Sequence, residues 1–250
     1  MRIACDLDGV LADLHEAFVR TATRLFPDLD PANLEAPDLG ASPPDDEAAQ
    51  GRNETDEPEE APPSELPSLA LTRRQADAVW KEVGKTEDFW EALSEIESGA
   101  IARLATLADE RRWEVLFITS RPKSAGRTVQ RQSQRWLVEQ GFPNPAAFVV
   151  HGNRGRVAEA LQIDVVIDDR PDNCLDVVLE SKAGAILVWR GSPESVPASA
   201  RRLGIAVVSS VDECLDALVQ ADEAKTSGGF LRRLRAVFGL KTRPPSPFGR

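Results

Sequence analysis

From Gly99 onward the chain alternates between short apolar runs and longer segments in which apolar residues recur at helical spacing. The apolar runs, with one near the start of the chain, are 2–7, 113–118, 146–150, 164–168, 184–189 and 205–208. The helical segments are 99–111, 126–140, 154–161, 172–182, 195–203 and 211–221. This alternation predicts an α/β fold, a Rossmann-like parallel sheet with helices on both faces. Ligands of such sheets bind beyond the carboxyl ends of the strands, so functional side chains should follow the apolar runs.

The segment between the first two predicted strands differs in composition. Helical spacing predicts helices over 13–26, 72–83 and 87–97. Residues 36–66, by contrast, are rich in proline and acidic side chains, and such a stretch buries too little surface to offset its ordering entropy. We therefore expect a disordered acidic insert there. A second interpretation is that the acidic segment binds a basic partner.

Composition argues against several classes of protein. No run of eighteen apolar residues occurs, so no transmembrane helix is expected. The start MRIACDLDGV does not resemble a secretory signal peptide. The cysteines Cys5, Cys174 and Cys214 form no CxxC pair, which argues against a disulfide scaffold or zinc site and fits a reducing cytoplasm. The formal net charge of -11 argues against a nucleic-acid partner, which would need a basic stripe.

Polar side chains follow three of the predicted strands. Asp6 and Asp8 end the first, 119–121 (Thr-Ser-Arg) ends the second, and Asp168 and Asp169 end the fourth. Four carboxylates at one sheet edge repel one another unless a cation lies among them. Oxygen ligands without His or Cys favour a hard ion such as Mg²⁺, which commonly bridges to phosphate. The sequence therefore predicts a magnesium site and a phosphate ester or anhydride as substrate.

The strings DLDGVLAD at 6–13, FITSR at 117–121 and VIDDRP at 166–171 resemble the motifs of haloacid dehalogenase (HAD) superfamily phosphohydrolases. The resemblance covers about 99–222 and the first 13 residues. It implies a HAD-type fold in which Asp6 is the nucleophile that forms an aspartyl-phosphate. Asp8 would be the general acid for the leaving oxygen and then the base that activates water.

The same resemblance assigns the remaining residues that bind phosphate and metal. Thr119 would hydrogen-bond a phosphoryl oxygen, with Ser120 close by. Asp169 would be the side-chain metal ligand of the last motif, with Asp168 in support. Asp6 and the backbone carbonyl of Asp8 would complete the protein ligands of Mg²⁺.

One position departs from the family pattern. The superfamily places a Lys before the strand that carries the paired aspartates, but no Lys lies between 124 and 181. Arg154 stands fourteen residues before Asp168, and its guanidinium can bind phosphate bidentately. Arg156 is a second candidate. Arg121 either touches substrate or pairs with a surface carboxylate, and Arg170 has the same two interpretations.

A closer resemblance is to the 5′(3′)-deoxyribonucleotidase branch, which implies a small helical cap inserted after the first strand. Phe89 and Trp90 match by position the aromatic pair that packs on the nucleobase there; the other interpretation is that both are core residues of the cap. We divide the chain into a core (1–13 and 99–222), a cap (14–98) and a tail (223–250).

The tail has its own character. Residues 229–240 place apolar side chains near one helical face and arginines elsewhere, and the end of the chain, 242–250, is expected to be disordered. A basic amphipathic helix packs on its own domain or a protein partner, or lies on an anionic membrane surface.

These observations together predict a cytoplasmic Mg²⁺-dependent phosphomonoesterase acting on a small phosphorylated metabolite, with nucleoside monophosphates first (a 5′-nucleotidase-like hydrolase). The alternatives are a HAD phosphatase for another small phosphate ester and a weakly catalytic module that recruits partners.

Overall fold

The computed structural model describes residues 1–29, 71–224 and 229–240. Six strands of this described part form one sheet: β1 (Arg2–Asp6), β2 (Glu114–Thr119), β3 (Ala146–Val149), β4 (Val165–Asp168), β5 (Gly184–Val188) and β6 (Ala206–Val208). Their order is β3-β2-β1-β4-β5-β6, and every pairing is parallel. The order changes direction between β1 and β4, and open parallel sheets bind ligands at such a switch point. The predicted α/β fold class is confirmed.

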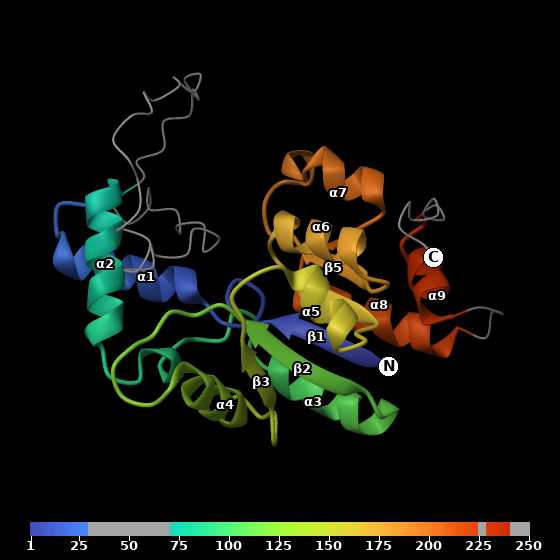
Figure 1. Ribbon diagram of the computed structural model, residues 1–250, viewed down its shortest axis with the longest axis horizontal. Coiled ribbons are helices and arrows are strands. Elements are labelled where there is room, and N and C mark those ends of the chain that lie inside the picture. Colours follow the sequence, from blue (N-terminus) through green and yellow to red (C-terminus); the bar gives the residue numbers. More distant parts are fainter. Residues whose placement is uncertain (30–70, 225–228, 241–250) are drawn as a thin grey trace.

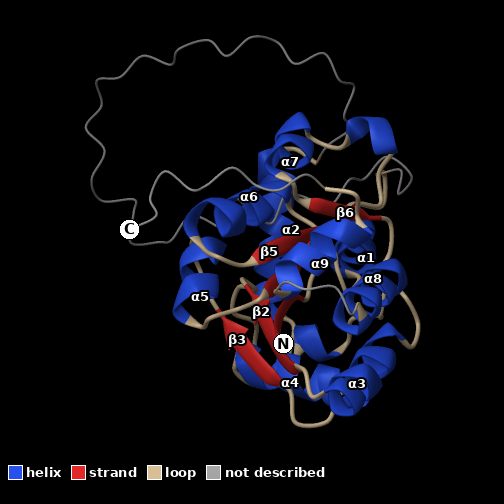
Figure 2. Cartoon of the chain, turned by 90° about the vertical axis from the view of Figure 1, so that its right-hand side faces the viewer, coloured by secondary structure: helices blue, strands red, loops and turns tan. Residues whose placement is uncertain are grey.

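Helices cover both faces of the sheet (Figure 2). Alternate strand residues point to opposite faces, so Ile3 and Cys5 of β1 lie in one apolar core and Ala4 lies in the other. The helices of the first core are α3 (Ala100–Arg111), α4 (Val129–Glu139) and α8 (Val211–Glu223). Those of the second are α5 (Arg154–Ala160), α6 (Pro171–Glu180) and α7 (Ala198–Leu203).

Two helices between β1 and β2 pack together at one side of the sheet (Figure 1). They are α1 (Leu14–Leu25) and α2 (Arg73–Lys85), and the rings of Phe18 and Trp80 lie 5.3 Å apart at their centroids. Asp13 caps α1, because its carboxylate accepts a hydrogen bond of 2.8 Å from the Glu16 backbone N–H.

The prediction of a helix over 87–97 is wrong. Only Phe89–Glu91 is helical there, as a 3-10 turn. Asp88, just before this turn, has φ 48°, in the left-handed region. The residues after the turn form backbone hydrogen bonds with the first motif. The Ile96 N–H donates to the Leu11 carbonyl at 2.8 Å, so the backbone groups that a helix would use are already engaged. The segment therefore joins α2 to the loop after β1.

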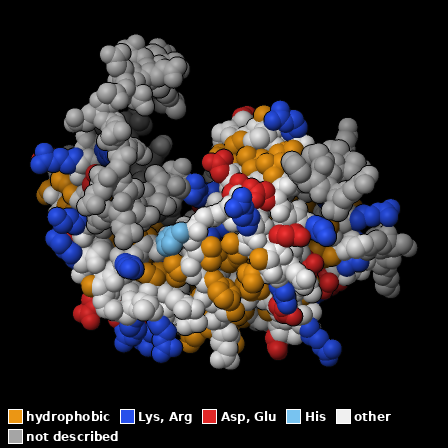
Figure 3. Space-filling view, in the orientation of Figure 1, with side chains coloured by type: hydrophobic (Ala, Val, Ile, Leu, Met, Phe, Trp, Pro, Cys, Tyr) orange, Lys and Arg blue, Asp and Glu red, His pale blue; other side chains and the backbone are white. Residues whose placement is uncertain are grey.

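The basic helix of the tail, α9 (Phe230–Val237), packs on α8. Leu234 is buried, and Arg233 Nε donates to the Ala221 carbonyl at 2.7 Å. Acidic and basic side chains are interspersed over the described part of the face in Figure 3. No helix among the described residues has the length and apolar content to cross a membrane. The disorder predicted for 36–66 and 242–250 lies outside the described residues.

Candidate active site

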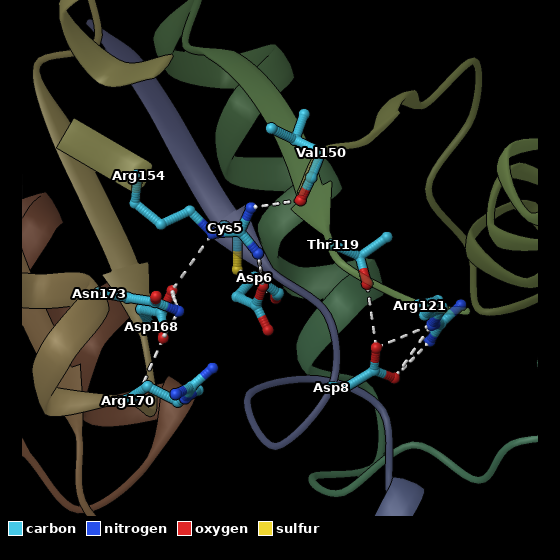
Figure 4. Close-up of polar contacts among 10 residues, drawn as sticks. All are labelled: Cys5, Asp6, Asp8, Thr119, Arg121, Val150, Arg154, Asp168, Arg170 and Asn173. Carbon is cyan, nitrogen blue, oxygen red and sulfur yellow. Dashed lines mark hydrogen bonds and ion pairs between the residues drawn. The ribbon is translucent and has the colours of Figure 1, made fainter. Parts of the chain in front are cut away.

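The switch point between β1 and β4 carries a buried charge cluster (Figure 4). Asp6 ends β1, Asp168 ends β4, and Arg154 begins α5 between them. Arg154 Nη2 donates to Asp6 Oδ1 at 3.2 Å and its Nη1 donates to the Val150 carbonyl at 3.1 Å, while its Nε lies 4.0 Å from Asp168 Oδ2. Arg156, the other candidate for this charge, is exposed and pairs with a surface glutamate, so Arg154 is the one that reaches Asp6.

The carboxylates of this cluster lack sufficient compensating charge. Burial raises the pKa of Asp6 well above its usual range, and Asp168 raises that pKa further, while Arg154 opposes the shift. Burial also raises the pKa of Asp168, against Arg154 and hydrogen bonds from the Arg170 N–H and the Asn173 amide. For Asp169, burial and then Asp168 raise the pKa to about 7. Ionised carboxylates at this edge therefore favour a cation beside them.

Gly9 makes room for one of these carboxylates. Its φ is +81°, and a Cβ at this position would lie 2.0 Å from Asp169 Oδ2. Any larger residue would strain the backbone and displace the Asp169 carboxylate. The glycine of the first motif thus allows the loop after β1 to approach the carboxylates after β4.

Asp8 lies on the other side of the loop and turns toward β2 (Figure 4). Thr119 Oγ1 donates to Asp8 Oδ2 at 3.0 Å. Arg121 donates from Nε to both Asp8 oxygens at 3.0 and 2.9 Å, and from Nη2 to Oδ1 at 2.8 Å. The interpretation that Arg121 pairs with a surface carboxylate is therefore wrong, because its buried guanidinium pairs with buried Asp8. A contact between Arg121 and substrate stays a prediction. Ser120, between them in sequence, is half-buried.

Phe89 and Trp90 take the core position rather than an open stacking position. Both are buried, with their rings edge to face at 5.0 Å. The Trp90 ring packs on the Arg121 guanidinium at 4.9 Å, and its Nε1 donates to the Pro122 carbonyl at 3.1 Å. Because Trp90 is fully buried, neither of its faces is open to a nucleobase in this arrangement.

Sequence reasoning missed Arg190 and Glu97. Arg190 follows β5 and donates to the carbonyls of Gly9 and Val10 and to Glu97 Oε1. Glu97 also accepts hydrogen bonds of 2.9 Å from the backbone N–H of Val211, at the start of α8. These contacts fix the loop after β1 against the rest of the core. Arg190 follows a strand, so the rule that functional side chains follow strands applied to it. No neighbouring motif marked this single Arg as part of the site.

The oxygen ligands at this sheet edge suit a hard divalent cation, but fewer carboxylates are available to it than the sequence predicts. Among the described residues, no three His, Cys, Asp or Glu side chains lie close enough to hold an ion by themselves. The Asp8 carboxylate is engaged by Arg121, and Asp168 is engaged by Asn173. Asp6, which Arg154 contacts at Oδ1 alone, and Asp169 are then the carboxylates that could hold the ion, with the backbone carbonyl of Asp8. Mg²⁺ commonly uses one or two carboxylates and keeps several waters, so this smaller set suits it.

We expect Mg²⁺ to raise the melting temperature, and to raise it more near pH 8 than near pH 5.5. The folded pKa of Asp169, about 7, lies above the unfolded value. Without metal, stability therefore falls as pH rises from about 4 to about 7, and Mg²⁺ offsets this loss once Asp169 is ionised. Thermal unfolding checks this, with Asp169→Asn against exposed Asp172→Asn as the matched control. An equal rise at both pH values, or one that survives Asp169→Asn, would contradict it.

The fold is similar to that of a solved HAD family hydrolase. A HAD family hydrolase from Deinococcus radiodurans R1, crystallised with bound phosphate and sodium, has a TM-score of 0.51 and 17% identity, over 87% of this chain and 94% of that chain. A hydrolase from Pseudomonas syringae gives 0.47 and 15% over 88% and 98%. A haloacid dehalogenase-like family protein from Streptococcus pneumoniae gives 0.43 and 13% over 86% and 96%. No family model and no curated protein matches the sequence. The chain has the fold of a HAD hydrolase.

Proposed function

We propose that this protein is a Mg²⁺-dependent phosphomonoesterase of the HAD superfamily that works through an aspartyl-phosphate. The observation that carries the proposal is the buried pairing of Asp6 with Arg154 at the switch point of a HAD-type sheet, with Asp8 two residues beyond Asp6. A buried carboxylate beside a guanidinium combines a nucleophile with a group that binds phosphate.

The reaction has two displacements. An Asp6 carboxylate oxygen forms a bond to phosphorus as the bond to the leaving oxygen breaks, and the leaving oxygen takes a proton from Asp8. Water then attacks phosphorus, its proton passes to Asp8, and the bond to Asp6 breaks to release inorganic phosphate. Asp8 thus regains the proton it gave up, and Asp6 regains its carboxylate. Arg154 offsets negative charge at the phosphoryl group in both steps.

The cation would be held by Asp6, Asp169 and the Asp8 carbonyl, with Asp168 positioning the loop through Arg170 and Asn173. When bound it would neutralise charge between the nucleophile and the phosphate. The three cysteines are all buried free thiols, which supports a reducing cytoplasmic setting.

For the substrate we propose a small phosphomonoester, with nucleoside monophosphates as the first class to test because of the motif resemblance. Buried Trp90 does not support base stacking, so a nucleobase would need other contacts. The alternative is a module that recruits partners through its acidic insert and basic tail, with weak catalysis because the usual Lys is missing. Arg154 supplies a cation beside Asp6, which favours the enzyme.

Phosphate release from a panel of phosphomonoesters, with Mg²⁺ and with chelator, tests the proposal. We expect turnover that needs Mg²⁺, because a metal-assisted displacement requires the ion. Preference for nucleotides would support the 5′-nucleotidase assignment, and preference for another class would reject that assignment and keep the mechanism. Absence of metal-dependent turnover across the panel would overturn the proposed function.

A further inference from the structure

Arg121 is the most completely enclosed charged side chain near the proposed reacting groups. Its side chain is 0% exposed, and Asp8, its partner, is 5% exposed. Nε and Nη2 are used on the two Asp8 oxygens, and Nη1 donates to Ser133 Oγ at 3.0 Å. A bidentate guanidinium fixes both the position and the plane of a carboxylate, which a single hydrogen bond does not.

Two tryptophans hold Arg121 in turn. The Trp90 and Trp136 rings lie 4.9 and 5.7 Å from the guanidinium carbon. Trp136 is itself fixed, since its Nε1 donates to the Leu93 carbonyl at 2.8 Å. Buried Gln132 accepts a hydrogen bond of 3.0 Å from the Trp90 backbone N–H. Trp90 and Leu93 belong to the segment that returns from the cap helices, and Trp136 and Gln132 belong to α4 of the core.

We propose that Arg121 is the positioning residue for Asp8, and that Trp90 makes the position of Asp8 depend on the segment returning from the cap helices. The proposal rests on the proposed function, because it concerns the acid–base group of that reaction. Thr119 holds one Asp8 oxygen, whereas Arg121 holds both, so loss of Arg121 leaves the carboxylate free to rotate about its remaining contact. Both displacements need Asp8 beside the reacting oxygen: the second uses the carboxylate that Arg121 holds, and the first uses the acid form, whose proton replaces one of the contacts on the two Asp8 oxygens.

The first displacement supplies a selective readout. An alkyl leaving group needs the proton from Asp8, whereas p-nitrophenolate leaves readily without it. We expect Arg121→Met to lower kcat/KM for the best alkyl phosphate by about 100-fold, the lower end of what a positioned acid contributes. For p-nitrophenyl phosphate we expect a loss within about fivefold, because its leaving group needs little acid catalysis.

The second displacement supplies an independent readout. Both substrates give the same aspartyl-phosphate, whose hydrolysis needs Asp8 as base. In Arg121→Met, we therefore expect a rapid burst of one p-nitrophenolate per enzyme and then a steady rate about 100-fold below wild type. Trp90→Phe should show the same pattern at smaller size, because a smaller ring packs less well on the guanidinium.

A matched pair of controls exists elsewhere in the chain. Arg111 also packs on a tryptophan, at 5.9 Å from the Trp113 ring, and also pairs with carboxylates, but at the opposite end of β2. Arg111→Met and Trp113→Phe should leave the alkyl-to-aryl ratio of kcat/KM unchanged. Arg121→Lys tests the geometry if Arg121→Met folds poorly, because an ammonium keeps the charge without the planar fork. Arg121→Lys should still lower kcat/KM more for the alkyl phosphate than for p-nitrophenyl phosphate.

Each outcome decides between the claims. Equal losses for the two substrates, or no loss in Arg121→Met and Arg121→Lys, would overturn the positioning role and leave the proposed function intact. In an Asp8→Asn background, Arg121→Met should cost little more, because no acid–base group is left to position. A wild-type protein that turns over neither substrate would overturn the proposed function itself.

Discussion

Asp6→Asn should abolish phosphate release and at the same time raise the melting temperature of the metal-free protein. The loss of turnover should be at least about 10⁴-fold, since removal of a covalent nucleophile leaves only binding and electrostatic effects. No phosphoryl-enzyme should be trapped, because the amide oxygen does not replace the carboxylate as nucleophile.

The gain in stability follows from the direction of the Asp6 pKa. Burial, Asp168, Asp169 and Asp8 all disfavour the ionised carboxylate in the folded protein, and Arg154 only partly opposes them. A raised folded pKa means that ionised Asp6 destabilises the protein above the unfolded pKa of about 3.9. Asn carries no charge, so the gain should be absent at about pH 3.5 and should grow as pH rises.

Asp13→Asn is the matched control, because it makes the same substitution in the same motif at the cap of α1. It should keep turnover, since Asn also caps helices well. Phosphate release and thermal unfolding of both variants, measured with chelator and with Mg²⁺, provide the check. Turnover surviving in Asp6→Asn would reject the nucleophile. Lower stability of Asp6→Asn at neutral pH would reject the account of an undercompensated carboxylate cluster.

Much of this site was predictable because strand ends in a parallel sheet meet at one edge. Asp6 and Asp168 each follow an apolar run, and the pairing of β1 with β4 brings those two ends together. Arg154 was a candidate because the family resemblance places a Lys at that spacing before the paired aspartates, and Arg156 was the second candidate. The prediction that Asp6 and Asp168 meet needed only the period of the strands and the topology of the sheet.

The partners of the side chains were not predictable in the same way. Asp8 and Arg121 are 113 residues apart in sequence, and their contact depends on the direction in which each side chain leaves its strand end. The enclosure of Arg121 depends further on Trp90, whose segment folds as a 3-10 turn and not as the expected helix. The family resemblance offered stacking or burial for Trp90, and neither interpretation identified the Arg121 guanidinium against which its ring packs.

The second large effect concerns Arg154, which stands where the family resemblance predicts a Lys. Arg154→Met should destabilise the protein by about 3 kcal/mol, because it leaves buried carboxylates without their cation. It should also remove most turnover, since the phosphoryl group loses its guanidinium. Arg154→Lys should recover part of both, because an ammonium restores charge but contacts fewer acceptors than the fork that now reaches Asp6 and the Val150 carbonyl.

Arg156→Met is the control, since it removes an arginine two residues away on the same helix from an exposed pair with Glu180. Exposed pairs contribute little, so its stability and turnover should stay close to wild type. Denaturant unfolding and phosphate release test all three variants. The double variant Asp6→Asn with Arg154→Met should be less destabilised than the single effects predict, because the uncompensated Asp6 charge is then absent. If Arg156→Met carries the loss and Arg154→Met does not, the charge that serves the phosphate lies outside the buried cluster, and Arg154 is a structural counterion of Asp6 and Asp168 alone.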